Sequence, residues 1–303
     1  MMFLEIYKLG KRIYDLSNWR EMHRFVVFMA RVLLNFSAIG KLYNWFKDDE
    51  QRFSILEKNP FLIEQATRAF FYAGSRLEER VSLICNHIEL LQSRFQSEWG
   101  KRLAAYDSCY KIWKSKEEDI NWYAQLTMEP GQRKEGLLSV MMLLDGNPLY
   151  QIIFWLDKDK NGDASMWIGA MQGPNMEDAR DIIKDITKRS YRYRTKNLIL
   201  YMTMAVARAL KVKHIYAVSN EGYYAMNHAR RDRKLKTDFG EFWEEAGGHK
   251  TEDARFYEVP LIEPRKTMEE VPTRKRAVYR KRFAFQDDVD DQIGTNMKKI
   301  LRG

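Results

Sequence analysis

The 303-residue chain is poor in the residues that build disulfide frameworks and metal centres. It has two cysteines, Cys85 and Cys109, and five histidines that form no close pair with ligand spacing. Two cysteines cannot supply a disulfide scaffold or a structural zinc site. We therefore expect both to be buried or partly buried thiols in a reducing compartment, and we expect no resident metal.

The sequence also lacks an apolar run long enough to cross a bilayer, which needs about 20 residues. Residues 25–46 come nearest, but Arg31, Asn35 and Lys41 recur on roughly one face, which predicts an amphipathic helix. The first residues include Glu5 where a signal peptide would need an apolar core. These absences predict a cytoplasmic protein that is at most peripheral at the inner membrane.

Positive charge exceeds negative charge, with 51 Lys and Arg against 42 Asp and Glu and a formal net charge of +9. Such an excess favours contact with anions, which include nucleic acid, acidic lipid surfaces and phosphorylated cofactors. Charge alone does not choose among these partners. At 45% hydrophobic residues the chain is globular and long enough for a large core.

The pattern predicts an α+β protein in three parts. Residues 1–100 have apolar residues at helical spacing and are expected to form a helical N-terminal region. Residues 101–265 are expected to form a mixed β-sheet flanked by helices. Strands are predicted over residues 120–129, 136–144, 149–157 and 164–171, an antiparallel meander closed by turns such as 145–148 and 157–163. A calcium site in the turn 157–163 is less favoured than a solvated hairpin, because the closing Glu of a calcium loop is absent.

The chain is organised around residues 197–220. Residues 198–210 are apolar nearly all round, which predicts a buried helix, and 214–218 form a short buried strand. A helix is expected before this unit, over 176–188. Helices over 223–233 and 239–246 and a strand over 256–261 are expected after it. A buried helix that leads into a buried strand is half of an α/β unit.

Residues 266–303 differ in composition and predict a basic C-terminal helix with an acidic tail. The cations are Arg274, Lys275, Arg276, Arg280, Lys281 and Arg282. Four carboxylates follow at once, at Asp287, Asp288, Asp290 and Asp291. The basic run is a candidate contact for an anionic membrane or another polyanion, and the acidic block could instead fold back and neutralise it.

Several motifs recur together along the C-terminal half. They are WIG at 167–169, QGP at 172–174, YRTKNL at 193–198, AVSN at 217–220, FWEEAGG at 242–248, and PRK at 264–266 leading to RKRAVYRKR at 274–282. In these motifs the chain resembles the VirK/YbjX family of bacterial proteins. The resemblance implies a link, in some pathogens, to virulence, envelope stress and tolerance of antimicrobial peptides. It implies no particular reaction.

The order of elements is similar to that of GNAT-type acyltransferases, which implies acyl-CoA as a cofactor. In that fold the strand before the main helix binds the pantetheine arm, and the helix N-terminus holds the pyrophosphate. The candidate acyl-CoA contacts are Gly169, Gln172, Gly173, Arg192, Arg194, Lys196, Ser219 and Asn220. The usual glycine-rich phosphate loop of these enzymes is absent. The chain is therefore either an acyltransferase or a degenerate relative that has lost the activity.

An acyltransferase needs a general acid or base, and the residue types suggest His228, Tyr223 and Glu244. The alternative is a peripheral membrane protein without enzymatic activity, which binds anionic lipid through residues 274–282, with the 25–46 helix as a second candidate contact. Nucleic-acid binding ranks last, because no helix-turn-helix, zinc-finger or RNA-recognition signature accompanies the basic run.

Overall fold

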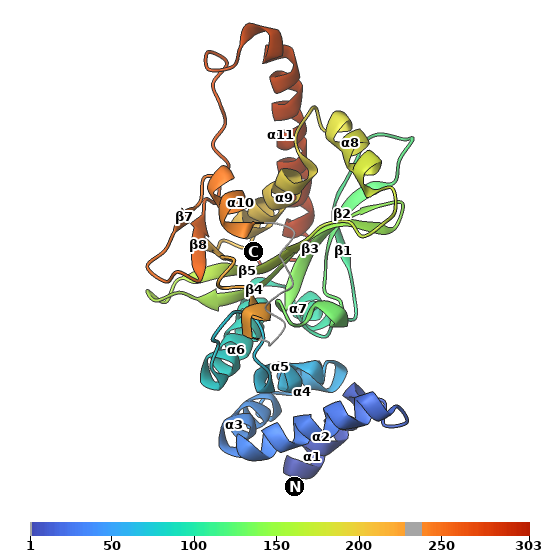
Figure 1. Ribbon diagram of the computed structural model, residues 1–303, viewed down its shortest axis with the longest axis vertical. Helices are drawn as coiled ribbons and strands as arrows, with labels where there is room; N and C mark the ends of the chain where they lie inside the picture. The colour runs from blue at the N-terminus through green and yellow to red at the C-terminus, as the bar shows by residue number, and fades with distance from the viewer. Residues whose placement is uncertain (1, 228–237) are drawn as a thin grey trace.

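One mixed β-sheet runs through the molecule, and helices cover both of its faces (Figure 1). The computed structural model describes residues 2–227 and 238–303. In this part of the chain eight strands follow the order β1-β2-β3-β4-β5-β6-β8-β7. They are β1 Tyr110–Lys114, β2 Trp122–Thr127, β3 Leu138–Leu144, β4 Asn147–Lys158, β5 Ala164–Gln172, β6 His214–Val218, β7 His249–Lys250 and β8 Phe256–Val259. The predicted α+β class is confirmed.

The predicted meander is confirmed as the antiparallel strands β2 to β5. Strand β6 then pairs parallel to β5, and β8 returns antiparallel to β6. The turn at 157–163 is a hairpin, in which the Asp159 carboxylate accepts from the backbone N–H groups of Asn161 and Asp163. These side-chain bonds to the backbone stabilise a tight turn.

Strand β1 was not predicted, because a bulge breaks its alternation and makes two successive residues, Ile112 and Trp113, buried. Helix α11 covers this edge strand. Gln292 accepts from the Lys114 N–H and donates to the Lys114 carbonyl, both at 3.1 Å, and Asn296 donates to the Ile112 carbonyl at 3.0 Å. The otherwise unpaired edge of the sheet is therefore satisfied by side chains of a helix more than 170 residues later in the chain.

In the described part of the chain, seven α-helices precede the sheet. They are α1 Met2–Ile13, α2 Trp19–Leu34, α3 Phe36–Lys47, α4 Glu50–Lys58, α5 Phe61–Thr67, α6 Leu77–Arg94 and α7 Ser97–Ala104. The single helix expected over 25–46 is wrong, because α2 and α3 meet at a 96° bend at Asn35. The Asn35 side chain donates to the Arg31 carbonyl at 2.8 Å, which satisfies an end group of α2 at the bend. Within residues 2–227 and 238–303, no single helix is both long and apolar enough to span a membrane, and only α2 and α3 together meet that criterion.

Two helices that follow the meander in the chain pack together on one face of the sheet. They are α9 Thr195–Ala209 and α11 Arg276–Lys298. Helix α9 contacts β3 and β4 on one side and α11 on the other, while α6 contacts β4 from the opposite face of the sheet. The expectation of a helix buried nearly all round is confirmed, with eleven of the fifteen α9 residues buried. Figure 1 shows α11 as a long helix whose first turns extend beyond the sheet.

The acidic block does not fold back onto the basic run, because one continuous helix, α11, contains most of the basic run and all of the acidic block. Its carboxylates instead bind other elements. Asp290 accepts from the Tyr201 hydroxyl at 2.8 Å and pairs with Arg208, both from α9. Asp287 pairs with Arg265 at 2.6 Å. These contacts fix α11 onto α9.

The remaining elements are α8 Ala179–Arg189 and α10 Phe239–Glu245. The helix expected over 223–233 is, in its described part, a single 3-10 turn at Tyr224–Asn227, and its later residues lie outside the described residues. Cys85 is partly buried, as expected, but Cys109 is exposed, which corrects the expectation for that thiol.

A buried carboxylate on α5 joins the N-terminal helices to the sheet. The Glu64 side chain is 0% exposed and accepts from Arg133 at 2.7 Å, Arg68 at 3.0 Å and the Tyr14 hydroxyl at 2.9 Å. Burial alone would raise the pKa of Glu64, but the hydrogen bond and charge of Arg133, and the charge of Arg68, outweigh burial and hold the pKa below its usual 4.5.

We expect Glu64→Gln to lower the free energy of unfolding by about 3 kcal/mol at neutral pH, because it leaves two partly buried guanidinium groups without their counter-charge. Glu98→Gln is the control, since Glu98 is an exposed partner of Arg102 at 3.8 Å and should cost less than about 1 kcal/mol. A carboxylate with a lowered folded pKa stabilises fully above its unfolded pKa. The wild type should therefore approach Glu64→Gln in stability as the pH falls below 4.5. Urea unfolding over this pH range measures both effects, and a pH-independent difference would contradict the assignment.

Candidate functional site

The candidate site lies where the parallel strands β5 and β6 stop pairing. Their register runs from Ser165 opposite His214 to Ile168 opposite Ala217. Beyond it, residues 170–172 pair only with β4, and the β4–β5 register shifts at Gly169, which has no partner in that register. In open sheets, ligands collect at the carboxyl ends of parallel strands. This edge of the sheet is therefore a candidate ligand site.

Glu135 occupies this edge from the segment before β3. A Cβ atom at Gly169 would lie 1.9 Å from the Glu135 carbonyl oxygen, so the close approach requires glycine. The Glu135 side chain accepts from the Tyr223 hydroxyl at 2.6 Å and from the Gln172 amide at 2.7 Å. Two predicted residues, Gln172 and Tyr223, thus meet on one carboxylate.

Glu135 is 5% exposed, and burial raises the pKa of its carboxyl against the two hydrogen bonds and the charge of Lys134. Burial and the neighbouring carboxylate also raise the pKa of the Tyr223 hydroxyl. A carboxylate with a raised pKa and a neutral tyrosine partner can accept and return a proton. Perturbed groups of this kind are candidates for general acid–base chemistry.

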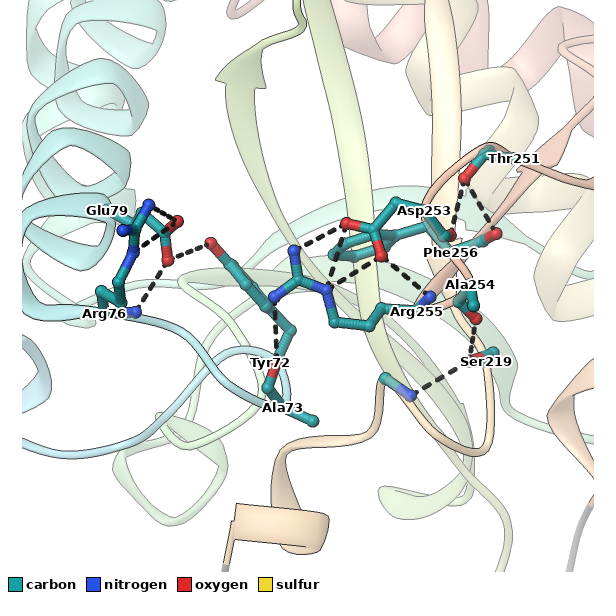
Figure 2. A network of polar contacts seen from close by, with 11 residues as sticks. Tyr72, Ala73, Arg76, Glu79, Ser219, Thr251, Asp253, Ala254, Arg255 and Phe256 are labelled. Atoms are coloured by element: carbon teal, nitrogen blue, oxygen red, sulfur yellow. Dashed lines mark hydrogen bonds and ion pairs between the residues drawn. The ribbon is translucent and has the colours of Figure 1, made fainter.

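A polar network holds the turn that carries Tyr223 (Figure 2). The Ser219 hydroxyl donates to the Ala254 carbonyl at 2.8 Å and accepts from the Gly222 N–H at 3.0 Å. The Arg255 guanidinium donates to the Asp253 carboxylate and to the Ala73 carbonyl. Ser219, predicted to contact a cofactor, therefore uses its polar atoms to fix the turn.

The network extends to the segment that leads into α6. Arg255 lies over the Tyr72 ring at 5.0 Å, and the Tyr72 hydroxyl donates to Glu79 at 3.1 Å (Figure 2). Glu79 also pairs with Arg76 at 3.1 Å. Chain segments around residues 72, 219 and 255 are thus locked together beside the sheet. Tyr223 therefore directly follows a turn that several hydrogen bonds hold in place, and a catalytic group needs such positioning.

A cavity of about 290 Å³ opens next to Gln172. Gln132 donates to the Gln172 side-chain carbonyl at 3.4 Å, and Gln172 donates to Glu135, so Gln172 connects the cavity with the buried carboxylate. The cavity is lined by Gln132, Asn147, Pro148, Leu149, Tyr150, Gln151, Gln172, Gly173, Asn175 and Met176. Gly173, a predicted cofactor contact, belongs to this lining.

The predicted phosphate-binding residues gather separately, at the start of α9. Arg194 and Lys196 both pair with Glu245 of α10, at 3.4 and 3.1 Å. The Arg192 carbonyl accepts from Arg282 at 2.9 Å. Across the described residues, no hydrogen bond or ion pair joins Arg192, Arg194 or Lys196 to Glu135.

The other predicted residues have structural partners elsewhere. Asn220 accepts from the Phe239 N–H at 2.8 Å and so supports the start of α10. Glu244 is exposed and accepts from the Tyr257 hydroxyl at 3.1 Å. His228 lies outside the described residues.

The basic run begins in a 3-10 turn, Thr273–Lys275, and continues along the first turns of α11. Four of its six cations are exposed: Arg274, Lys275, Arg280 and Lys281. Arg276 donates to the Val271 carbonyl, and Arg282 donates to the carbonyls of Tyr191 and Arg192. The run lies at the end of the molecule opposite α1 to α3 (Figure 1).

Among residues 2–227 and 238–303, one group of side chains has donor atoms close enough together to bind a metal. Atoms of Asp159, Asp163 and His214 lie within 4.8 Å of one another. Asp159 already accepts two backbone N–H groups of the hairpin, and the His214 ring bonds Glu258 at 2.7 Å. These contacts account for Asp159 and His214 as structural parts of the turn and of the neighbouring strand.

Glu135 is the residue that reasoning from the sequence missed. It sits in the segment 133–137, after the turn at 130–131 and before β3, where a charged residue ordinarily faces solvent. Two glycines indicate a close approach, Gly136, whose Cβ position would meet the Phe154 carbonyl at 2.7 Å, and Gly169, whose Cβ position would meet the Glu135 carbonyl. A close approach at a glycine can be recognised only once the folded structure is known.

Comparison with known proteins identifies the family. The model described as "Protein of unknown function (DUF535)" matches residues 17–295. The chain belongs to the DUF535 family. It is 28% identical over 247 residues to "Uncharacterized protein YbjX" of Escherichia coli K12, which covers 80% of this chain and 73% of the relative. The predicted resemblance to the VirK/YbjX family is thereby confirmed.

More distant relatives cover less of the chain. Two proteins of Haemophilus influenzae, each named "Uncharacterized protein", are 26% identical over 173 and 123 residues, or 56% and 40% of both this chain and the relative. No solved structure matches the chain. The names of these relatives state no activity.

We expect the Glu135 carboxyl to make stability depend on pH in the direction opposite to Glu64. A group whose folded pKa is raised favours the fold when protonated, so the wild type should gain stability relative to Glu135→Gln as the pH falls from neutral toward 4.5. Urea unfolding of both proteins across this pH range measures the difference in stability. An unchanged difference across this range would show that the pKa of Glu135 is not raised.

Proposed function

We propose that this DUF535 protein is an acyltransferase that takes an acyl group from an acyl-CoA thioester, with Glu135 as the general base. The observation that carries the proposal is the buried Glu135–Tyr223–Gln172 cluster at the carboxyl ends of the parallel strands β5 and β6. Fold alone does not imply function, whereas a buried acid with a tyrosine partner supports a specific chemistry.

The sheet supports the GNAT-like part of the proposal. An antiparallel meander leads into β5, the crossover through α8 and α9 returns to the parallel strand β6, and β8 follows antiparallel. This is the element order expected from the resemblance to acyltransferases. In the described part of the chain, no strand pairs with the β6-side edge of residues 169–172. Unpaired backbone groups on such an edge can bind the amides of a pantetheine arm.

The proposed reaction transfers the acyl group from sulfur to an amine or hydroxyl acceptor. The acceptor attacks the thioester carbonyl and loses its proton to Glu135, and the carbon–sulfur bond breaks. The departing thiolate takes the Tyr223 proton, and Tyr223 is reprotonated by Glu135 across their 2.6 Å hydrogen bond. Atoms and charges balance, and the products are the acylated acceptor and free CoA thiol.

The start of α9 is the proposed contact for the CoA phosphates. Helix N-termini favour anions, and Arg194 and Lys196 add positive charge there. The Glu245 carboxylate already pairs with both cations. A phosphate group would therefore have to displace Glu245, so Glu245 should weaken cofactor binding.

We expect calorimetric titration with acetyl-CoA and a long-chain acyl-CoA to show saturable binding that persists at moderate salt. Arg194→Ala should weaken binding about fivefold and Glu245→Gln should strengthen it by a similar factor, since each change alters one ion pair. Arg274→Ala is the matched control and should bind as the wild type does. Absence of binding to a folded sample would rule out the proposed cofactor.

Glu135→Gln should bind the same acyl-CoA with unchanged affinity but lose about 100-fold or more in turnover, because a general base contributes that much. Turnover is measured as release of free CoA thiol in the presence of a panel of amine and hydroxyl acceptors. Glu244→Gln is the control and should keep its rate. Equal rates for wild type and Glu135→Gln would remove Glu135 from the mechanism.

The second candidate function is binding of an anionic surface through residues 274–282 without catalysis. It is favoured by Arg274, Lys275, Arg280 and Lys281, for which the described residues provide no ion-pair partner. Such a surface fits the role in envelope stress and antimicrobial-peptide tolerance that the VirK/YbjX resemblance implies. A basic cluster with few apolar side chains gives weak binding that salt abolishes.

A further inference from the structure

The N-terminal helices expose an unusual amount of apolar surface. Eight of the eleven large apolar side chains that are exposed in the described residues lie within residues 3–36. They are Phe3, Leu4 and Tyr7 of α1, Trp19, Val26, Leu33 and Leu34 of α2, and Phe36 at the start of α3. Exposed apolar side chains gathered in this way mark an interaction surface.

Helix α2 is apolar on both of its faces. Its inner face buries Phe25, Phe28, Met29 and Val32 against the core. Its outer positions Trp19, Val26 and Leu33 follow helical spacing and are 74%, 58% and 57% exposed. The outer face of a surface helix is ordinarily polar. The outer face of α2 therefore has no partner within the described part of the chain.

The three helices pack closely, so their exposed side chains lie on one body. A Cβ atom at Gly10 of α1 would meet the Phe25 ring at 2.8 Å, and one at Gly40 of α3 would meet Met2 at 2.9 Å. Figure 1 shows α1, α2 and α3 together at one end of the longest axis. The apolar side chains thus belong to a single end of the molecule.

The charge around this end is positive. Residues 2–47 contain eight Lys or Arg against three Asp or Glu. The exposed cations are Lys8, Lys11, Arg12, Arg20, Arg24, Lys41 and Lys47. Two of them have carboxylate partners, Lys8 with Glu5 and Arg24 with Glu21. Apolar side chains bordered by cations are the pattern of a helix that lies in the interface of an anionic membrane.

We propose that the outer surface of α1, α2 and the start of α3 docks onto an anionic lipid bilayer. Together α2 and α3 are apolar enough for a membrane span, yet they are bent by 96° and their inner faces are buried in the core. The helices therefore lie on the bilayer and insert their outer side chains. The basic run at 274–282 lies at the opposite end of the molecule and faces away from this membrane (Figure 1).

Flotation of the full chain with vesicles of phosphatidylglycerol and phosphatidylethanolamine tests the proposal. We expect the wild type to float at low salt and, because apolar insertion is not screened, to keep most of its binding at high salt. The double variant Val26→Gln, Leu33→Gln should bind at least about tenfold more weakly, since it removes two inserted apolar side chains. Ile262→Gln is the matched control, as Ile262 is a 69% exposed apolar residue outside these helices.

Two further measurements separate the proposal from its competitors. The double variant Arg280→Glu, Lys281→Glu should float as the wild type does, and loss of binding only in that variant would assign the membrane contact to the basic run and overturn the proposal. Light scattering in solution tests whether a second copy covers the face. A wild-type dimer that Val26→Gln, Leu33→Gln converts to a monomer would overturn lipid docking, as would a folded wild type that does not float.

Discussion

The buried Glu64 carboxylate is the contact on which the candidate site depends. It joins Tyr14 after α1, Arg68 after α5 and Arg133 before β3, which are separate in sequence. The adjacent Gln65 donates to the carbonyls of Arg133 and Gly136 at 2.7 and 3.3 Å. One turn of α5 thus holds both ends of the segment that contains Glu135. The N-terminal helices, which form no part of the sheet, therefore position Glu135 beside it.

Local patterns in the sequence predicted the meander, the buried helix α9 and the turn at 157–163, because each is set by neighbours in the chain. They failed where a distant segment decides the outcome. Strand β1 needs the side chains Gln292 and Asn296 of α11 to satisfy its edge. The break between α2 and α3 depends on Asn35, a residue that also fits an uninterrupted amphipathic helix. Gln172 and Tyr223 were predicted by type and position, but Glu135, which joins them, was not.

The two ends of the molecule differ in the apolar and charged side chains that they expose. The end formed by α1 to α3 has apolar side chains bordered by cations, and the end formed by the start of α11 has cations with few apolar neighbours. Because the ends are opposed along the longest axis, a flat membrane can contact one of them at a time. Apolar insertion resists salt and a purely ionic contact does not. An attachment through α1 to α3 would leave the basic end free for a soluble or polyanionic partner.

Glu64 and Glu135 are both buried, yet their surroundings shift the pKa of the two carboxyl groups in opposite directions. Glu64 faces two guanidinium groups, so its ionised form is compensated and the carboxylate serves as a fixed strut. Glu135 faces the neutral donors Tyr223 and Gln172, which compensate the charge only in part. A site that exchanges protons needs an acid whose two charge states are close in free energy. In the segment 133–136, the ion pair between Arg133 and Glu64 fixes the backbone. Glu135 lies two residues later, where its hydrogen-bond partners are neutral and its carboxyl group can gain or lose a proton.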